Sequence, residues 1–372
     1  MPRLPPTLLR QACAIDPRLT RLLPVCRDLP SAQSELRWLA EHAASESLNQ
    51  KGPNGRHLLR SYIDRRARGE PLQYILGTEY FGDLELKCRP GVLIPRPETA
   101  ASTSYLTRLL SSGSTRHALP AHLRILDLCT GSGAIPLLFH HDFYSYPTNK
   151  SCSLDVVGVD ISETCLRLAM DNLARQLTTP HTTRDNVNMR DTLKAISFMR
   201  ADVMSGDLFD PPGDAPSVLD ALQQHTDASA PPRCDILISN PPYIAAASFR
   251  STTSRSVRRY EPSLALVPKH ASIGASDHDG DAFYPRIVAL AEQLEAKIML
   301  VEVADMDQAT RVAAMAASER RWERIEIWRD DPTSLAVDQV TIDDTMFRVL
   351  GKGHGRSVFA YRGAAGAWMG RP

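Results

Sequence analysis

From residue 123 onward, short apolar runs alternate with longer segments of helical periodicity. This order is typical of a parallel α/β sheet with helices on both faces. Two of the intervening segments, 162–173 and 284–296, place their apolar residues on one helical face. The runs expected to form the strands of one doubly wound, seven-stranded sheet are 123–128, 156–160, 198–202, 235–240, 298–303, 324–328 and 357–362.

Polar stretches interrupt this pattern and are predicted to be surface insertions. They cover residues 140–154, 177–193, 211–232 and 245–257.

The region before the sheet differs in character. Residues 1–70 show helical periodicity, with helices expected at 31–48 and 56–68, and are predicted to form a small helical domain. Residues 71–98 combine aromatic and β-branched residues with glycines and prolines, as a hairpin linker does. Residues 99–372 are predicted to form the main domain.

The first 29 residues alternate arginine with leucine and contain only two acidic residues. They fit a weak organelle transit peptide and, equally, the first helix of a folded domain. Both interpretations stay open at this point.

Composition excludes several classes of protein. Lys+Arg and Asp+Glu both number 43, so the chain lacks the basic excess of a nonspecific nucleic-acid binder, and no direct nucleic-acid contact is expected. The seven cysteines are scattered without a C-x-x-C pair, which argues against a disulfide framework or a metal site. Since no run of 18 apolar residues occurs, no membrane-spanning helix is expected.

A glycine-rich turn follows the first expected strand of the sheet. Gly131 and Gly133 come directly after 123–128, and a helical segment begins next. Glycines at such a turn let the backbone pass close to a ligand. The second expected strand ends in Asp160, whose carboxylate can accept two hydrogen bonds from a ribose diol. Together these features favour a ligand that contains a nucleoside.

A dinucleotide is the weaker interpretation of this ligand. Pro136 occupies the place of the third glycine of a G-x-G-x-x-G fingerprint. Asp127, at the end of the first strand, fits a cationic amino-acid ligand better than a pyrophosphate, whose charge it would repel.

The sequence Asn240-Pro241-Pro242-Tyr243 follows the apolar strand 235–240. Ligands bind at the carboxyl ends of strands in open α/β sheets. The two prolines stiffen the loop, so the Asn240 side-chain oxygen and the Pro241 carbonyl can both accept from one planar NH2 group. The Tyr243 ring can stack on its flat face. This arrangement selects an amide or an exocyclic amine.

These three signals in this order resemble the class I S-adenosylmethionine-dependent amino methyltransferases, which have a Rossmann-like sheet. The linker narrows the resemblance, because residues 69–77 (GEPLQYILG) and 91–99 (GVLIPRPET) are similar to the signature of HemK-type protein-glutamine methyltransferases. Members of that family methylate the Gln of the Gly-Gly-Gln motif of peptide-chain release factors. They also have an N-terminal helical domain, which implies substrate recognition by residues 1–70.

The resemblance implies S-adenosyl-L-methionine as the cofactor and a release factor as the protein substrate. It implies catalysis by Asn240, Pro241, Pro242 and Tyr243, without a metal. Asp160 is expected to hold the ribose hydroxyls and Asp202 the adenine amine. The cofactor-binding residues would be Asp127, Thr130, Gly131, Gly133, Asp160, Asp202 and Asn240.

Some residues depart from the family pattern or have no assigned role. Ala100 stands where a second acidic residue is usual, Ala304 replaces a glycine, and the segment 330–355 is longer than expected. Arg96 and Glu98 fit either a structural or a substrate role, and Glu302 is expected to be structural.

The insertions and the arginine-rich start are similar to a eukaryotic organellar version of the family. We therefore expect a monomer that acts on a mitochondrial release factor. Its expected location is mitochondrial, with the cytoplasm as the alternative. A ribosomal-protein glutamine methyltransferase and a nucleic-acid adenine-N6 methyltransferase remain alternatives at this point.

Overall fold

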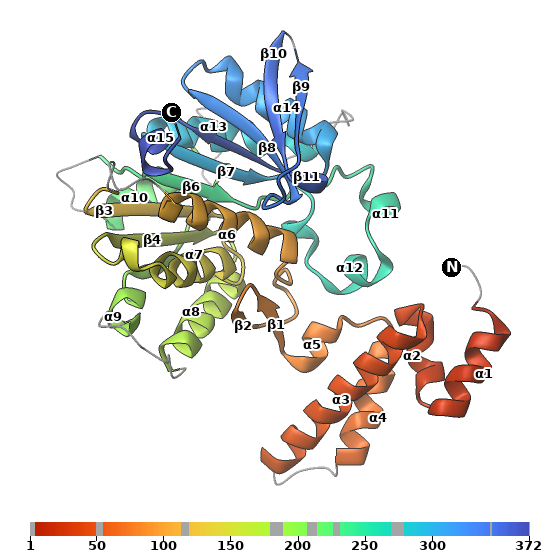
Figure 1. The fold of residues 1–372 in the computed structure, drawn as a ribbon. Helices are drawn as coiled ribbons and strands as arrows, with labels where there is room; N and C mark the ends of the chain where they lie inside the picture. The colour runs from red at the N-terminus through yellow and green to blue at the C-terminus, as the bar shows by residue number, and fades with distance from the viewer. Residues whose placement is uncertain are drawn as a thin grey trace. The chain divides into compact units, whose positions relative to one another are not determined.

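The computed structural model describes residues 4–49, 55–112, 119–178, 189–206, 214–225, 231–268, 279–342 and 344–371. The chain divides into two compact units (Figure 1). The helical unit comprises residues 1–78, 88–90 and 253–261, and the sheet unit comprises residues 79–87, 91–252 and 262–372.

The helical unit packs its helices around a leucine-rich core that includes Leu22, Leu39 and Ile63. Helices α3 (Leu29–Asn49) and α4 (Gly55–Ala67) confirm the helices expected at 31–48 and 56–68. The Ser256 hydroxyl donates to the Gly69 carbonyl, 2.6 Å away, and ties α12 to this unit. The other helices of the unit are α1 (Pro6–Ile15), α2 (Leu19–Cys26), α5 (Leu72–Leu76) and α12 (Arg255–Tyr260).

The start of the chain contributes to this core. Leu19, Leu22 and Leu23 are at most 1% exposed. Residues 19–23 therefore belong to the folded helical unit, as the folded-domain interpretation expects.

A two-stranded sheet lies in the segment that was expected to be a hairpin. Its strands are β1 (Thr78–Phe81) and β2 (Leu84–Lys87). Gly82 has φ +57° in the two-residue turn between them, a conformation that this type of turn requires and that glycine adopts without strain.

The main sheet has nine strands in the order β5-β4-β3-β6-β7-β11-β8-β10-β9. The first five strands of this order are parallel, and β11 runs antiparallel to β7 and β8. The strands are β3 (His122–Leu128), β4 (Ser153–Asp160), β5 (Ile196–Arg200), β6 (Ile236–Ser239), β7 (Ile298–Glu302), β8 (Arg324–Asp331), β9 (Val337–Ile342), β10 (Thr345–Leu350) and β11 (Lys352–Tyr361).

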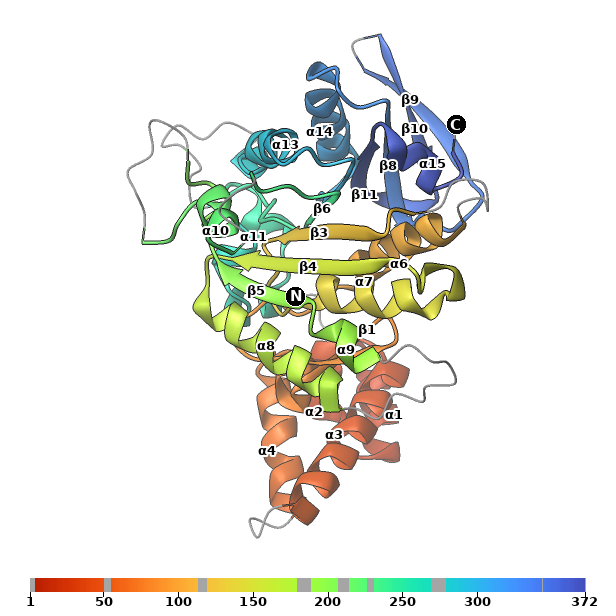
Figure 2. The same ribbon diagram turned by 90° about the vertical axis from the view of Figure 1, so that its left-hand side faces the viewer.

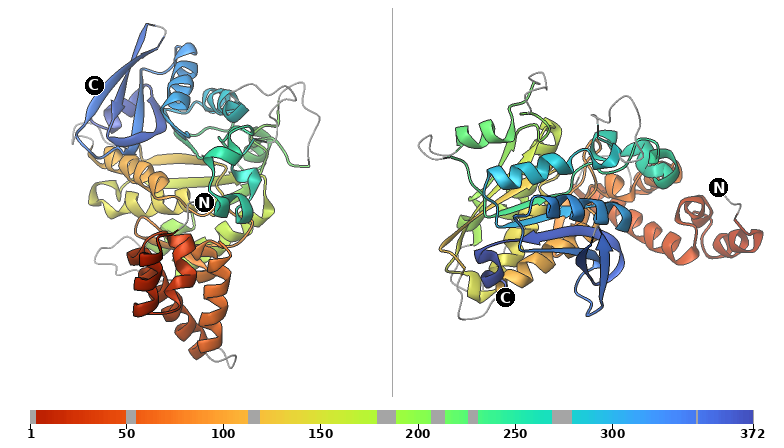
Figure 3. Two further views of the ribbon diagram at one scale, coloured as in Figure 1. Left: turned by 90° about the vertical axis from the view of Figure 1, so that its right-hand side faces the viewer. Right: turned by 90° about the horizontal axis from the view of Figure 1, so that it is seen from above.

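The α/β fold class is confirmed, and each of the seven expected strands is present. The number of strands was wrong, because β9 and β10 extend the sheet at one edge (Figure 3). Both lie within 330–355, the segment that was expected from the sequence to be longer than in the resembled family. The sequence did not reveal β9 because most of its side chains are exposed, and it therefore contains no apolar run.

Helices cover both faces of the sheet (Figure 2). One core, with Leu138 and Phe359, lies under α6 (Pro97–Ser112), α7 (Ala134–Ser145) and α8 (Glu163–Thr178). The other, with Ile287 and Val312, lies under α10 (Val218–His225), α13 (Tyr284–Gln293) and α14 (Met306–Ser318). The short helices of the unit are α9 (Met189–Leu193), α11 (Phe249–Thr252), α15 (Ala364–Trp368) and the 3-10 turns Pro147–Asn149, Ser263–Ala265 and Asp279–Asp281.

The expected surface insertion at 140–154 was wrong over much of its length. Helix α7 continues to Ser145 and buries Phe143 and Tyr144. The polar residue His140 of the same helix is buried as well, so polar composition did not mark a surface segment here.

The insertion expected at 211–232 also contains core residues, since Val218 and Leu222 of α10 are buried. By contrast, α11 buries no residue, as expected for 245–257. Residues 179–188 of the insertion at 177–193, and residues 211–213 and 226–230, lie outside the described residues.

Across the described part of the chain, no helix is long and apolar enough to cross a bilayer. The same residues hold no group of three or more His, Cys, Asp or Glu side chains that could bind a metal ion.

Candidate functional site

The turn between β3 and α7 has a backbone that glycine favours at three positions. Gly131 and Gly133 have φ +56° and +75°. Cys129 has φ +62°, although it carries a Cβ atom. A Cβ added to Gly133 would lie 2.8 Å from the Phe198 ring, so this glycine lets the helix approach the sheet closely. A Cβ on Gly131 would meet nothing within 4 Å, which leaves this part of the turn open to a ligand.

Asp160, the last residue of β4, is held against this turn. Its two carboxylate oxygens accept from the backbone N–H groups of Gly131, at 2.8 Å, and Ser162, at 2.9 Å. Burial raises the pKa of the Asp160 carboxyl, while these two backbone hydrogen bonds oppose the rise. The carboxylate is thus fixed where it lines the cavity, in a position to accept from a diol.

Asp127 and Thr130 are buried beside the same turn. Neither carboxylate oxygen of Asp127, nor the hydroxyl of Thr130, has a hydrogen-bond partner among the described residues. Burial raises the pKa of the Asp127 carboxyl to about 8. The Thr130 hydroxyl beside it opposes this rise of the pKa. Buried polar groups are seldom left unpaired, and Thr130 also lines the cavity, so its hydroxyl is suited to a polar ligand group.

Asp202 follows β5 at the same edge of the sheet. Its Oδ1 atom accepts from the backbone N–H of Met204 at 2.9 Å, which fixes the carboxylate. Its other oxygen can accept from an amine.

The loop 240–243 is braced from behind. Gln308 donates through Nε2 to the Tyr243 carbonyl at 3.2 Å and to Asp281 Oδ1 at 2.8 Å. Gly280 lies so close that a Cβ there would be 2.4 Å from the Tyr243 carbonyl oxygen. The backbone of this loop therefore has little freedom to shift.

A buried chain of hydrogen bonds runs from Asn240 into the sheet. The Asn240 Nδ2 atom lies 3.3 Å from the Thr99 hydroxyl, and that hydroxyl donates to Glu302 Oε2 at 2.5 Å. The Tyr243 hydroxyl donates to the other oxygen of the same carboxylate, Glu302 Oε1, at 3.1 Å. Burial raises the pKa of the Glu302 carboxyl, and the Thr99 hydroxyl, the nearby Arg356 and the Tyr243 hydroxyl counteract the rise.

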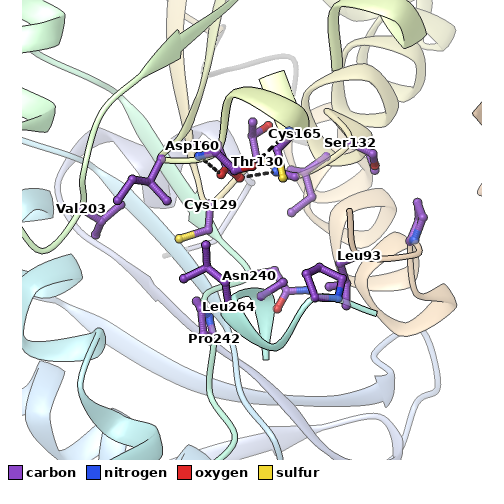
Figure 4. A pocket seen from close by; sticks show the side chains of 18 of the residues that line it. Leu93, Cys129, Thr130, Ser132, Asp160, Cys165, Val203, Asn240, Pro242 and Leu264 are labelled. Atoms are coloured by element: carbon purple, nitrogen blue, oxygen red, sulfur yellow. Dashed lines mark hydrogen bonds between the residues drawn. The ribbon is translucent and has the colours of Figure 1, made fainter. Parts of the chain in front are cut away.

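These features meet at one cavity in the sheet unit. In Figure 4, Asn240, Pro242 and Leu264 lie across the cavity from Cys129, Thr130 and Asp160. The sequence-predicted residues that line it are Thr130, Gly131, Asp160, Asp202, Asn240 and Pro242.

Four sequence-predicted residues do not line the cavity: Asp127, Gly133, Pro241 and Tyr243. Asp127 is buried behind the turn, and Gly133 serves helix packing. The Tyr243 hydroxyl is bound to Glu302, and stacking of its ring on a substrate stays a prediction.

Sequence reasoning gave no role at the site to Thr99 or Gln308, and it expected Glu302 to be structural. Thr99 lies in the linker motif and lines the cavity together with Arg96. Glu302 ends β7 at the carboxyl edge of the sheet, as Asp160 ends β4, and this shared position was the available signal. Nothing in the sequence pairs Gln308 with the loop, because that contact depends on tertiary packing.

Comparison with known proteins places this site in context. The chain is 30% identical over 268 residues to the mitochondrial MRF1 N(5)-glutamine methyltransferase MTQ1 of Saccharomyces cerevisiae, a match that covers 72% of this chain and 68% of that relative. It is 32% identical over 260 residues to the probable MRF1 mitochondrial N(5)-glutamine methyltransferase mtq1 of Schizosaccharomyces pombe, covering 68% and 70%.

A release factor glutamine methyltransferase of Haemophilus influenzae is 27% identical over 273 residues, covering 73% of this chain and 76% of the relative. Among solved structures, the catalytic domain of hMettl16 in complex with an MAT2A 3′UTR hairpin is similar, with 14% identity, a TM-score of 0.42, and coverage of 81% of this chain and 80% of that chain. No family model matches the chain. Since the two fungal matches, at 30% and 32% identity, each cover more than two thirds of the relative, the chain belongs to the release factor glutamine methyltransferases.

Proposed function

We propose that this enzyme transfers a methyl group from S-adenosyl-L-methionine to the side-chain amide nitrogen of the Gln in the Gly-Gly-Gln motif of a mitochondrial peptide-chain release factor. The observation that carries the proposal is the position of Asn240 in one cavity with Asp160 and the open Gly131 turn. An amide-binding loop thus faces groups suited to a nucleoside.

The residues present fit the cofactor. Thr130 lines the cavity with a hydroxyl that can bind the polar methionine end, and the open face of Gly131 lets that end approach the backbone. Asp127, buried behind the turn, would act on that end through the Thr130 hydroxyl beside it. We assign the ribose hydroxyls to Asp160 and the adenine amine to Asp202. When bound there, the cofactor supplies an electrophilic methyl group on a sulfonium.

The residues of the chain act mainly by orienting the amide. An amide nitrogen is a poor nucleophile because its lone pair is delocalised into the carbonyl. Asn240 Oδ1 and the Pro241 carbonyl would accept its two N–H bonds and fix the direction of the nitrogen. Pro242 stiffens the loop, and Tyr243 holds Glu302 from the other side. A Glu substrate would place its carboxylate against two acceptors and would be rejected.

The substrate and its compartment are proposed from the relatives. The two fungal relatives carry MRF1 and mitochondrial in their names, and this favours a mitochondrial release factor and a mitochondrial location here. Residues 1–70 are proposed to recognise that factor.

The test supplies methyl-labelled S-adenosylmethionine with separate samples of mitochondrial and cytosolic release factors, their Gly-Gly-Gln to Gly-Gly-Ala variants, ribosomal protein and DNA. We expect label on the mitochondrial factor and its loss in the variant. Label on the cytosolic factor alone would refute the proposed mitochondrial substrate and location. Label only on ribosomal protein or on DNA would refute the substrate.

A further inference from the structure

We propose that Glu302, acting through Thr99, fixes which end of the Asn240 amide faces the substrate, and so makes the site choose a carboxamide over a carboxylate. The inference rests on the proposed function and deepens it. It assigns Thr99 and Glu302 as positioning residues, because neither needs to touch the reacting atoms.

The argument begins with the single proton of the Thr99 hydroxyl. This hydroxyl donates to Glu302 Oε2, so its oxygen can only accept from Asn240. The Asn240 group that faces Thr99 must therefore be the NH2, at 3.3 Å. The carbonyl oxygen of the same planar amide then points away from Thr99, and Asn240 meets the substrate as an acceptor.

Glu302 determines the direction in which the hydrogen bonds from Asn240 through Thr99 are donated. Its carboxylate accepts from Thr99 and Tyr243 through different oxygens. The residue is 5% exposed, so bulk water does not compete for these positions. The Tyr284 hydroxyl donates to the Glu302 backbone carbonyl and leaves the carboxylate to the other two hydroxyls.

The variant Glu302→Gln would reverse this direction while keeping the shape of the side chain. The Tyr243 proton needs an acceptor in the buried site, so the Gln oxygen takes the Tyr243 position and the Gln NH2 faces Thr99. The Thr99 hydroxyl then accepts from Gln and donates to the Asn240 oxygen. The Asn240 amide turns over and presents its NH2 to the substrate.

The experiment compares the wild type with Glu302→Gln, Thr99→Val and Thr99→Ser. For each protein it measures kcat on a Gly-Gly-Gln release factor, the Kd for S-adenosylmethionine, and the Kd values of the Gly-Gly-Gln and Gly-Gly-Glu factors. Ser102→Ala is the matched control. It removes a hydroxyl that is also buried on α6, but one that pairs with Ser357 at 3.0 Å rather than with the Asn240 chain.

We expect Glu302→Gln to lower kcat about a hundredfold and to shift the ratio of the two factor Kd values at least tenfold toward the Glu form. Thr99→Val should lower kcat about tenfold, and Thr99→Ser should restore it. The Kd for S-adenosylmethionine should stay within about threefold, and Ser102→Ala should keep kcat within about twofold.

A merely structural Glu302 would weaken both factors equally and leave the ratio of their Kd values unchanged, which would overturn the inference. An active wild type with a Glu302→Gln variant of unchanged kcat and unchanged preference would do the same, while leaving the proposed function intact. A wild type that leaves the Gly-Gly-Gln factor unlabelled would refute the proposed function itself.

Discussion

Asp160 and Asn240 lie in the same cavity but are assigned to different partners, the ribose of the cofactor and the amide of the substrate. Replacing each side chain by alanine should therefore affect a different quantity: kcat for Asn240 and the cofactor Kd for Asp160. Asn240→Ala should lower kcat by about 100-fold or more while cofactor Kd changes little, because positioning of the amide is lost. Asp160→Ala should instead raise the cofactor Kd first. Calorimetric titration and steady-state kinetics measure both, and loss of cofactor binding in Asn240→Ala would contradict its role.

Asp127 couples stability to pH because burial raises the pKa of its carboxyl to about 8. An unfolded aspartate titrates near about 3.9. Between these values the folded state holds a proton that the unfolded state has released, so the free energy of unfolding falls as pH rises from about 4 to about 8. The slope from this group is at most about 1.4 kcal/mol per pH unit.

Asp127→Asn should remove this contribution, since the amide does not titrate. Urea unfolding at pH 6 and pH 8 measures the difference between variant and wild type. The exposed Asp307, replaced by Asn, controls for the loss of one negative charge. Equal slopes in wild type and Asp127→Asn would rule out the buried carboxyl as the source.

Cys129 is a residue with a Cβ in a left-handed conformation, at φ +62°. Such a conformation costs roughly 1–2 kcal/mol relative to glycine. Cys129→Gly loses the contacts of the thiol but relieves this strain, so its stability should stay within about 1 kcal/mol of the wild type. Cys129→Val should lose about 2 kcal/mol or more, since a β-branched residue fits this region poorly. Denaturant unfolding midpoints of the two variants measure these stabilities. Equal stability of Cys129→Gly and Cys129→Val would argue against backbone strain at position 129.

At the scale of elements, the loop 240–243 depends on two segments far from it in sequence. Gly280 and Gln308 pack against the Tyr243 carbonyl. Gly280→Ala would force a Cβ into that carbonyl and displace the loop, so kcat should fall at least about tenfold. Gly55→Ala is the control, because a Cβ there meets its neighbours at 3.5 Å or more. A Gly280→Ala enzyme with wild-type kcat would show that the loop tolerates the shift.

Strands with apolar runs could be predicted from the sequence. Strands β6 and β7 are wholly buried, and β3 and β4 each contain a buried, mostly apolar run. The hairpin of β9 and β10 could not, because an edge strand needs few apolar residues. The end of helix α7 was wrongly predicted to be a surface insertion, because local composition there is polar although Phe143 is buried.

The candidate site also contains residues that could be predicted from the sequence and residues that could not. Gly131, Asp160 and Asn240 follow strands directly, so their convergence at one edge could be predicted from the order of elements. The partners of Asn240 could not, because Thr99 precedes it by 141 positions and Glu302 stands on another strand. Their hydrogen bonds exist only once α6 and β7 are packed.

At the scale of the whole molecule, the formal net charge is zero and the isoelectric point is about 7.2. Repulsion between copies is therefore weakest near neutral pH. Light scattering at low salt should show more self-association at pH 7.2 than at pH 8.5. An association independent of pH would point to an apolar rather than an electrostatic cause.

The edge of the nine-stranded sheet that is formed by β9 also affects self-association. Strand β9 exposes most of its side chains, among them Asp338 and Gln339. Polar edge strands resist pairing with a further strand. Asp338 and Gln339 therefore oppose pairing at this edge, whereas the exposed Val337 does not.

The hydrogen-bond chain behind Asn240 has an evolutionary consequence. If the preference for an amide is set at position 302, a lineage can lose or invert that preference by one exchange there while its Asn-Pro-Pro-Tyr sequence stays intact. Retention of that tetrapeptide in a distant homologue would then be a weak guide to what it methylates. The pair of residues at positions 99 and 302 would be the better marker for inferring chemistry across a gene tree.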